Sequence, residues 1–188
     1  MKLCLGRDAA GTIILHCETE KMALLDILEY PDPRLNRPAT PIVRVNKDIL
    51  RLADDMAETM YDAPGIGLAA PQVAAGQQLI VVDISENRNE LLTLVNPEII
   101  EAHGIEEMKE GCLSVPGVYE LVQRAERIKV RAQDLQGKPL ELEADGLLAV
   151  CLQHEIDHLH GRIFVEHLSR LKQNLIRKKL TKRQRQAG

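Results

Sequence analysis

The segment DGLLAVCLQHEIDHLHG, residues 145–161, decides the fold around it. Asp145 is a suitable N-cap and Gly161 a suitable stop, so the pattern predicts a helix between them. His154 and His158 lie four residues apart, which puts their imidazoles about 40° apart around a helix. Two imidazoles on one helix face can bind one metal ion, so the segment predicts a metal-binding helix.

Glu155 stands between the two histidines and has the position of a general base that takes a proton from water. The alternative is that the two histidines are unconnected and that Glu155 is exposed. Apolar residues precede the motif on the same helix, which indicates a buried element. A buried helix with two imidazoles and a carboxylate is costly without a metal ion or polar partners.

A catalytic tetrahedral site needs a third protein ligand. A metzincin protease would supply a histidine six residues after the second one, where this chain has Phe164. Glu166, the counterpart of a thermolysin-like ligand, follows too closely to be a good candidate. Cys112 in the EGCLS segment at 110–114 is a better one, because a thiolate and two imidazoles bind divalent metals well. Cys151 is expected to serve core packing.

Outside this helix, the pattern predicts an α+β domain. Asn46 is a suitable N-cap for a helix that ends before Pro64, and the small residues of 65–72 predict a loop. The other predicted elements are strands at Leu79–Ile84, Leu91–Val95 and Arg127–Ala132, a hairpin turn at Gln136–Lys138, and a third, amphipathic helix marked by Leu168, Leu171 and Leu175.

The composition is that of an ordinary globular protein of 188 residues, with 45% hydrophobic and 28% charged residues. Aromatic residues make up only 2%, which argues against a stacking platform for single-stranded nucleic acid. No run of about 18 apolar residues predicts a membrane span, and no secretory signal is recognisable. We therefore expect a cytoplasmic protein, in which at least two of the four cysteines serve metal binding or burial rather than disulfides.

Charge and composition divide the chain into three parts. Residues 170–188 carry eight of the 24 basic residues and none of the 28 acidic ones. This basic tail predicts either contact with an anionic partner or a solvated helix end. Residues 1–21 differ from the rest and are expected to be an N-terminal extension, vector-derived or from an alternative start, with a β-hairpin around Ala10-Gly11 as the alternative. Residues 22–169 then form the catalytic domain.

Three motifs together resemble the signatures of the bacterial peptide deformylase family. They are GIGLAAPQ at 65–72, EGCLS at 110–114 and QHEIDH at 153–158, and the resemblance extends from Met22 to about Lys182. It implies an α+β fold with antiparallel β-sheets packed around a central metal-binding helix, and a C-terminal helix. It also implies a metal-dependent hydrolase that removes the N-formyl group from the N-terminal methionine of new proteins and releases formate.

The resemblance implies a role for each matched residue. Cys112, His154 and His158 would be the metal ligands, and Glu155 the general acid and base. The Gln72 side chain and the Leu113 backbone N–H would donate to the oxyanion. The substrate-binding residues would be Gly65, Ile66, Gly67, Glu110, Gly111, Leu147, Val150 and Cys151. For Leu147 and Val150, plain core packing remains an equal alternative.

The same resemblance implies Fe²⁺ as cofactor, one ion per chain, with Zn²⁺, Ni²⁺ or Co²⁺ able to substitute. Ligand types alone favour zinc. The implied partners are N-formylmethionyl nascent peptides and the ribosome, contacted through the basic tail; we expect no membrane partner and a monomer. An endoprotease with the same helix and a non-enzymatic metal-binding or ribosome-associated protein are the alternatives. Because a structural site needs a fourth ligand rather than a base, Glu155 argues against the second.

Overall fold

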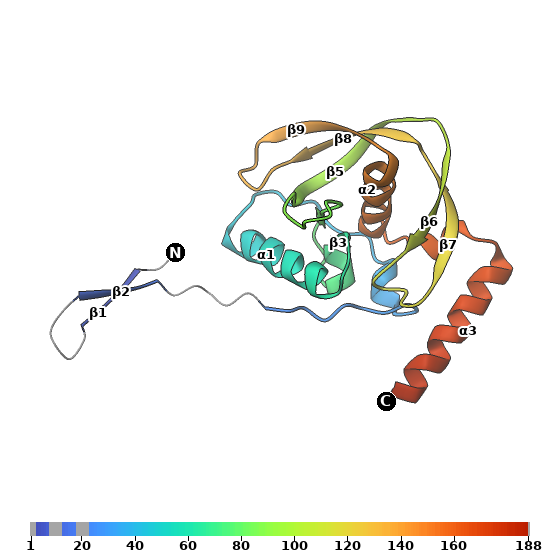
Figure 1. The fold of residues 1–188 in the computed structure, drawn as a ribbon, viewed down its shortest axis with the longest axis horizontal. Helices are drawn as coiled ribbons and strands as arrows, with labels where there is room; N and C mark the ends of the chain where they lie inside the picture. The colour runs from blue at the N-terminus through green and yellow to red at the C-terminus, as the bar shows by residue number, and fades with distance from the viewer. Residues whose placement is uncertain (1–2, 8–12, 18–22, 188) are drawn as a thin grey trace.

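The computed structural model describes residues 3–7, 13–17 and 23–187. A five-stranded antiparallel sheet has the order β3-β4-β5-β8-β9, and the helix α2 (Gly146–Leu159) packs against it. Figure 1 shows α2 between this sheet and the separate β6–β7 hairpin, with the C-terminal helix α3 running along the outside. The expected α+β fold with antiparallel sheets around a central helix is confirmed.

The strands of the large sheet are β3 (Gly67–Ala69), β4 (Leu79–Val82), β5 (Leu92–His103), β8 (Arg127–Gln133) and β9 (Pro139–Asp145). The prediction of a loop over 65–72 is wrong: its middle is strand β3, followed by a 3-10 helix η2 (Ala70–Val73). Small side chains suit this segment because β3 is buried throughout. β5 runs well past the predicted end at Val95, because Asn96 takes a positive φ of 50° and the pairing with β8 resumes after a bulge.

The two predicted long helices form where their caps indicate. α1 (Lys47–Asp62) begins after Asn46, whose side chain accepts a hydrogen bond from the N–H of Ile49 at 3.0 Å. α2 ends at Leu159, and Gly161 follows with a positive φ of 71°, the conformation that favours glycine after a helix. The end of the helix at Leu159 agrees with the predicted position of Gly161, so the histidine motif lies within α2 as expected.

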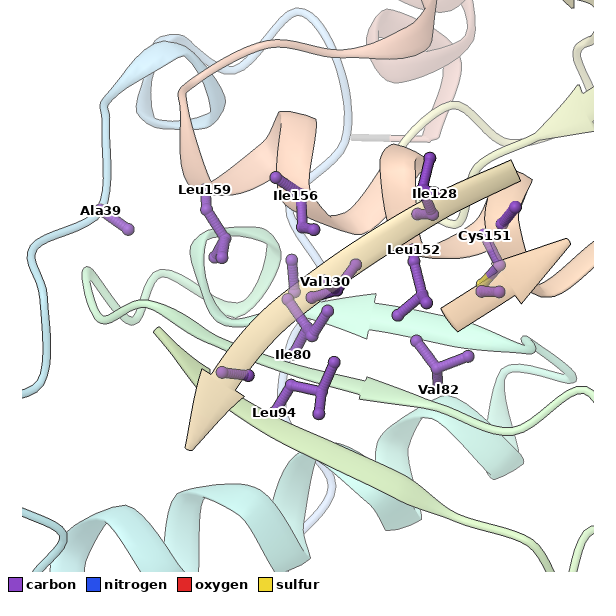
Figure 2. Packing of buried hydrophobic residues seen from close by; sticks show 14 residues of the cluster. Ala39, Ile80, Val82, Leu94, Ile128, Val130, Cys151, Leu152, Ile156 and Leu159 are labelled. Carbon is purple, nitrogen blue, oxygen red and sulfur yellow. The ribbon is translucent and has the colours of Figure 1, made fainter. Parts of the chain in front are cut away.

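The apolar side of α2 packs into the main core, which Figure 2 shows from close by. Cys151, Leu152, Ile156 and Leu159 of the helix meet side chains of the sheet, among them Ile80, Val82, Leu94, Ile128 and Val130. Burying apolar side chains of this size contributes roughly 1.5–3 kcal/mol each. The sheet therefore holds α2 firmly, and His154 and His158 point from another side of the helix.

A second core joins the β6–β7 hairpin to α3. The hairpin consists of β6 (Glu106–Gly111) and β7 (Tyr119–Arg124), and α3 spans Arg170–Ala187. The predicted apolar face of α3 is wrong: Leu171 and Leu175 are 71% and 58% exposed. The helix instead buries Ile176 and Leu180. It can do so because their partners are the hairpin valines and two short 3-10 helices, η1 (Pro33–Asn36) and η3 (Phe164–His167).

Near the N-terminus, β1 (Leu3–Arg7) and β2 (Ile13–Cys17) pair in antiparallel register. This is the pairing that the hairpin alternative requires, whereas its turn at Ala10-Gly11 lies outside the described residues. Among the described residues, no helix is long and apolar enough to cross a membrane.

Candidate active site

Three possible metal ligands meet where β6 ends against α2. Cys112 directly follows β6, and His154 and His158 lie one turn apart on α2. Their ligand atoms all lie within 4.8 Å of one another, and the Cys112 Sγ is 3.3 Å from Nε2 of His158. Thiolates and imidazoles bind such ions at about 2.3 and 2.0 Å, so this group has the composition and spacing of a divalent-metal site.

A buried carboxylate fixes the ring of His154. Glu110 Oε2 lies 2.7 Å from Nδ1 of His154, which leaves Nε2 as the ligand atom. Burial lowers the pKa of His154, but the neighbouring Cys112 and the hydrogen bond to Glu110 outweigh it and raise the pKa well above its ordinary value. A cation at the same place would satisfy the same negative groups, which favours metal binding by this ring.

His158 is fully buried and its Nδ1 has no hydrogen-bond partner among the described residues. Burial, reinforced by His154, lowers its pKa well below the ordinary value. The ring is therefore neutral near pH 7, and a neutral imidazole has the lone pair that a metal ligand needs.

Glu155 is 4% exposed, and its Oε2 has no hydrogen-bond partner in the described part of the chain. Burial raises the pKa of Glu155 to about 7, with His154 acting in the opposite direction. A carboxylate whose pKa lies near neutrality can both accept and return a proton. An unpartnered buried oxygen next to three metal ligands is the strongest sign that this site performs chemistry.

The carboxamide of Gln72 is held in one orientation. Its Oε1 accepts from the N–H of Ala69 at 2.8 Å, and its Nε2 donates to Oγ of Ser114 at 3.1 Å. Nε2 also lies 3.5 Å from the Cys112 Sγ, so the donor side of the amide faces the ligands. Leu113 follows Cys112 and lines the same cavity. The Gln72 amide therefore presents a fixed hydrogen-bond donor to the cavity.

A cavity of about 430 Å³ opens in front of these groups. All eight residues expected to bind substrate line it, as do Gln72, Cys112, Leu113, His154 and Glu155. Leu147 is 43% exposed and belongs to the cavity wall, not the core. Val150 is 4% exposed; it belongs to the buried core and also lines the cavity wall. Cys151 likewise serves both, and burial, followed by the charges of Glu155 and Glu110, raises the pKa of its thiol well above the ordinary value.

A buried ion-pair network supports the site, and sequence reasoning missed it. The Arg124 guanidinium donates to both oxygens of Glu110, at 2.7 and 3.1 Å, and to Oδ2 of Asp157. Asp157 also lies 2.8 Å from Nε2 of His167. Glu110 thus lines the cavity and also orients the ring of His154 through a hydrogen bond. The DH pair of the helix motif places Asp157 next to a ligand, but no pattern in the sequence singled out Arg124.

The family model described as "Polypeptide deformylase" matches residues 24–174. The chain belongs to the polypeptide deformylase family.

Several peptide deformylases are similar to this chain over most of their own length. A peptide deformylase of Alkalilimnicola ehrlichii is 58% identical over 88% of this chain and 93% of the relative. One of Chromobacterium violaceum is 58% identical over 88% of this chain and 99% of the relative. The crystal structure of the Legionella pneumophila peptide deformylase has a TM-score of 0.84 at 49% identity, covering 88% of this chain and 98% of that one.

As a deformylase, this chain is a hydrolase that removes the N-formyl group from the N-terminal methionine of newly synthesised proteins. Deformylases depend on a metal ion, and the Cys112, His154 and His158 group is a possible site for it. The endoprotease and non-enzymatic alternatives are therefore wrong.

Gly67 is expected to be essential for the placement of Glu155. A Cβ added at Gly67 would meet the Glu155 carboxylate and lie 2.8 Å from the Cys151 Sγ. Because both side chains are buried, Gly67→Ala must displace Glu155, and a displacement of about 1 Å can cost about 100-fold in rate. We expect a loss of about 10- to 100-fold in formate release, measured on a formyl-methionyl peptide.

The matched control is Gly76→Ala, where an added Cβ meets nothing within 4 Å. This variant should keep parental activity. Parental activity of Gly67→Ala would show that Glu155 is not held where the structure has it.

Proposed function

We propose that Cys112, His154 and His158 hold one Fe²⁺ and that Glu155, Gln72 and Leu113 carry out the deformylation. The observation that supports this is the unpartnered, buried Glu155 oxygen beside three clustered ligands, at the base of a cavity. Formate release by variants of Glu155 and Cys112 tests these roles.

A divalent ion in this site would supply Lewis-acid chemistry, which polarises a carbonyl and makes water more acidic. Glu155 accepts the proton of the attacking water at its unpartnered Oε2. As the formyl oxygen becomes negative, the Gln72 Nε2 and the Leu113 N–H donate hydrogen bonds to it. Glu155 then passes its proton to the nitrogen of the leaving peptide, and formate departs. Its pKa of about 7 suits both transfers.

The rest of the cavity binds the peptide. The wall formed by Ile66, Leu147, Val150 and Cys151 is apolar enough to take the methionine side chain. Gly65, Gly67 and Gly111 line the cavity and present backbone rather than side chains of their own to the peptide. β3 is the edge strand of the five-stranded sheet, so an extended peptide can pair with its free side.

The identity of the ion is tested by its response to oxygen. Zn²⁺, Ni²⁺ and Co²⁺ fit the same ligands, but Fe²⁺ beside the Cys112 thiolate is exposed to oxidation of both metal and sulfur. We expect the iron form to lose activity slowly in air and the nickel form to keep it. Formate release after timed exposure to air measures this, and equal air stability of the two forms would contradict the iron proposal.

Helix α3 is proposed to bring the enzyme to the ribosome through contacts with rRNA phosphates. Arg177, Lys178 and Lys182 are exposed on it, whereas Ile176 and Leu180 are buried and make its removal disruptive. We therefore expect the double variant Arg177→Glu, Lys178→Glu to bind ribosomes more weakly at low salt, with a salt dependence reduced by roughly one counterion per lost phosphate contact.

Cosedimentation with ribosomes over a salt series measures this, with the exposed Lys138→Glu as charge control. Formate release from a free peptide should be the same in all three proteins. Unchanged ribosome affinity in the double variant would rule out this role for α3.

We further propose that residues 22–169 form the catalytic domain, that 170–188 form a basic docking helix, and that 1–21 are an extension outside it. The enzyme is proposed to act as a monomer in the cytoplasm, where formylated chains leave the ribosome.

A further inference from the structure

Among the exposed residues that line the mouth of the cavity, those with the largest side chains are Ile66, Lys109, Tyr119 and Leu147. The ligand histidine His154 and Glu155 lie at the buried end of the same cavity. A peptide whose formyl group is at the buried end must leave past the mouth. Three of the mouth residues offer apolar or aromatic surface, and Lys109 offers a charge.

The hairpin register fixes Lys109 at this position. Tyr119 of β7 lies opposite Gly111 of β6, and its ring covers that glycine so closely that a Cβ there would lie 2.5 Å from a ring carbon. Lys109 is two residues away on the same face of β6, and its Nζ lies 5.7 Å from the centre of the Tyr119 ring. A cation at this distance is attracted weakly by the ring, which keeps the ammonium near the mouth.

The charge of Lys109 is not neutralised by its surroundings. No carboxylate in the described part of the chain lies within ion-pair distance, 4.0 Å, of its Nζ. Of the other charged residues that line the cavity, Glu110 is engaged by Arg124 and His154, and Glu155 is buried at the far end. Lys109 therefore places an unpaired positive charge at the mouth of the cavity, although the chain as a whole has a net charge of −4.

Strand geometry relates Lys109 to a position in the peptide. Lys109 precedes Cys112 by three residues, which is about 10 Å along an extended chain. β3 and β6 both line the cavity. An extended peptide bound between them has the same rise per residue as these strands. With the formyl group at the ligands, the side chain near Lys109 belongs to the third residue.

We propose that Lys109 is a specificity-determining residue that favours peptides with an acidic side chain at the third position. The inference rests on the proposed function, since it takes the formyl group to be bound at the Cys112, His154 and His158 group. The ammonium pairs with the carboxylate in the bound peptide and in the transition state alike. The preference therefore lies in KM and leaves kcat nearly unchanged.

The test compares three formyl-methionyl tetrapeptides that differ only in glutamate, glutamine or lysine at the third residue. At low salt we expect kcat/KM for the glutamate peptide to exceed that for the lysine peptide by about two- to fivefold, the range of an exposed ion pair. Lys109→Gln should remove the preference, Lys109→Glu should reverse it, and high salt should weaken it. Lys138→Glu makes the same charge change on the β8–β9 turn and should keep the parental ratio.

The glutamine peptide reports deformylation without a charged side chain. An unchanged glutamate-to-lysine ratio in Lys109→Glu, with normal turnover of the glutamine peptide, would overturn this inference and leave the proposed function standing. Loss of turnover of all three peptides by the metal-loaded parent would instead contradict the proposed function, and this inference with it.

Discussion

Glu155→Gln is expected to lower formate release by about 10²- to 10⁴-fold, the usual contribution of a general acid or base. Glutamine keeps the size of the side chain and loses the ability to take a proton. The parental group is buried, has an unpartnered Oε2 and has its pKa raised to about 7. Because the ligands are untouched, the variant should bind metal as the parent does. The measurement is kcat on a formyl-methionyl peptide, with metal content determined on the same samples.

The control for this variant is Glu143→Gln on the exposed side of β9, which should be fully active. A Glu155→Gln enzyme with parental kcat would refute the role of Glu155. Loss of bound metal from the variant would show that Glu155 acts as a ligand rather than as a base.

Cys112→Ala is expected to abolish tight metal binding and, with it, measurable formate release. The substitution removes the thiolate from a three-ligand group, and two imidazoles alone do not complete a catalytic site. The change also leaves the negative Glu110 beside His154 without the ion that it helps to bind. Competition with a chelator, followed through the rate of metal loss, measures the affinity independently of activity.

Cys151→Ala is the matched control for metal binding. Cys151 is also a free cysteine and lines the same cavity, but it lies outside the ligand group. Its alanine variant should hold metal as tightly as the parent. Equal metal retention by Cys112→Ala and the parent would contradict the ligand assignment.

The parts that the sequence predicts well are those governed by local rules. The caps at Asn46 and Gly161 place α1 and α2 to within a residue or two, and the i, i+4 histidines place two ligands on one side of α2. The third ligand, Cys112, lies 42 positions before His154, too far away for a local rule to connect them. The resemblance to deformylases supplied that link, and the structure brings the three residues together.

The parts that local patterns missed depend on tertiary partners. The β6–β7 hairpin is largely charged and polar, so alternation alone did not reveal it. Arg124 is buried only because Glu110 and Asp157 meet it from two other elements. Helix α3 offers leucines on one face and Ile176 and Leu180 on another, and the hairpin valines determine which face is buried. No single segment carries this information.

Metal reconstitution tests directly whether the enzyme depends on an ion held by Cys112, His154 and His158. Protein purified without oxygen is stripped with a chelator, and Fe²⁺ is titrated back while formate release from a formyl-methionyl peptide is followed. We predict that activity disappears on stripping, returns in proportion to added Fe²⁺, and saturates at one ion per chain, with no return in Cys112→Ala. Full activity in the stripped protein, or equal recovery by Cys112→Ala, would contradict a metal-dependent deformylase centred on Cys112, His154 and His158.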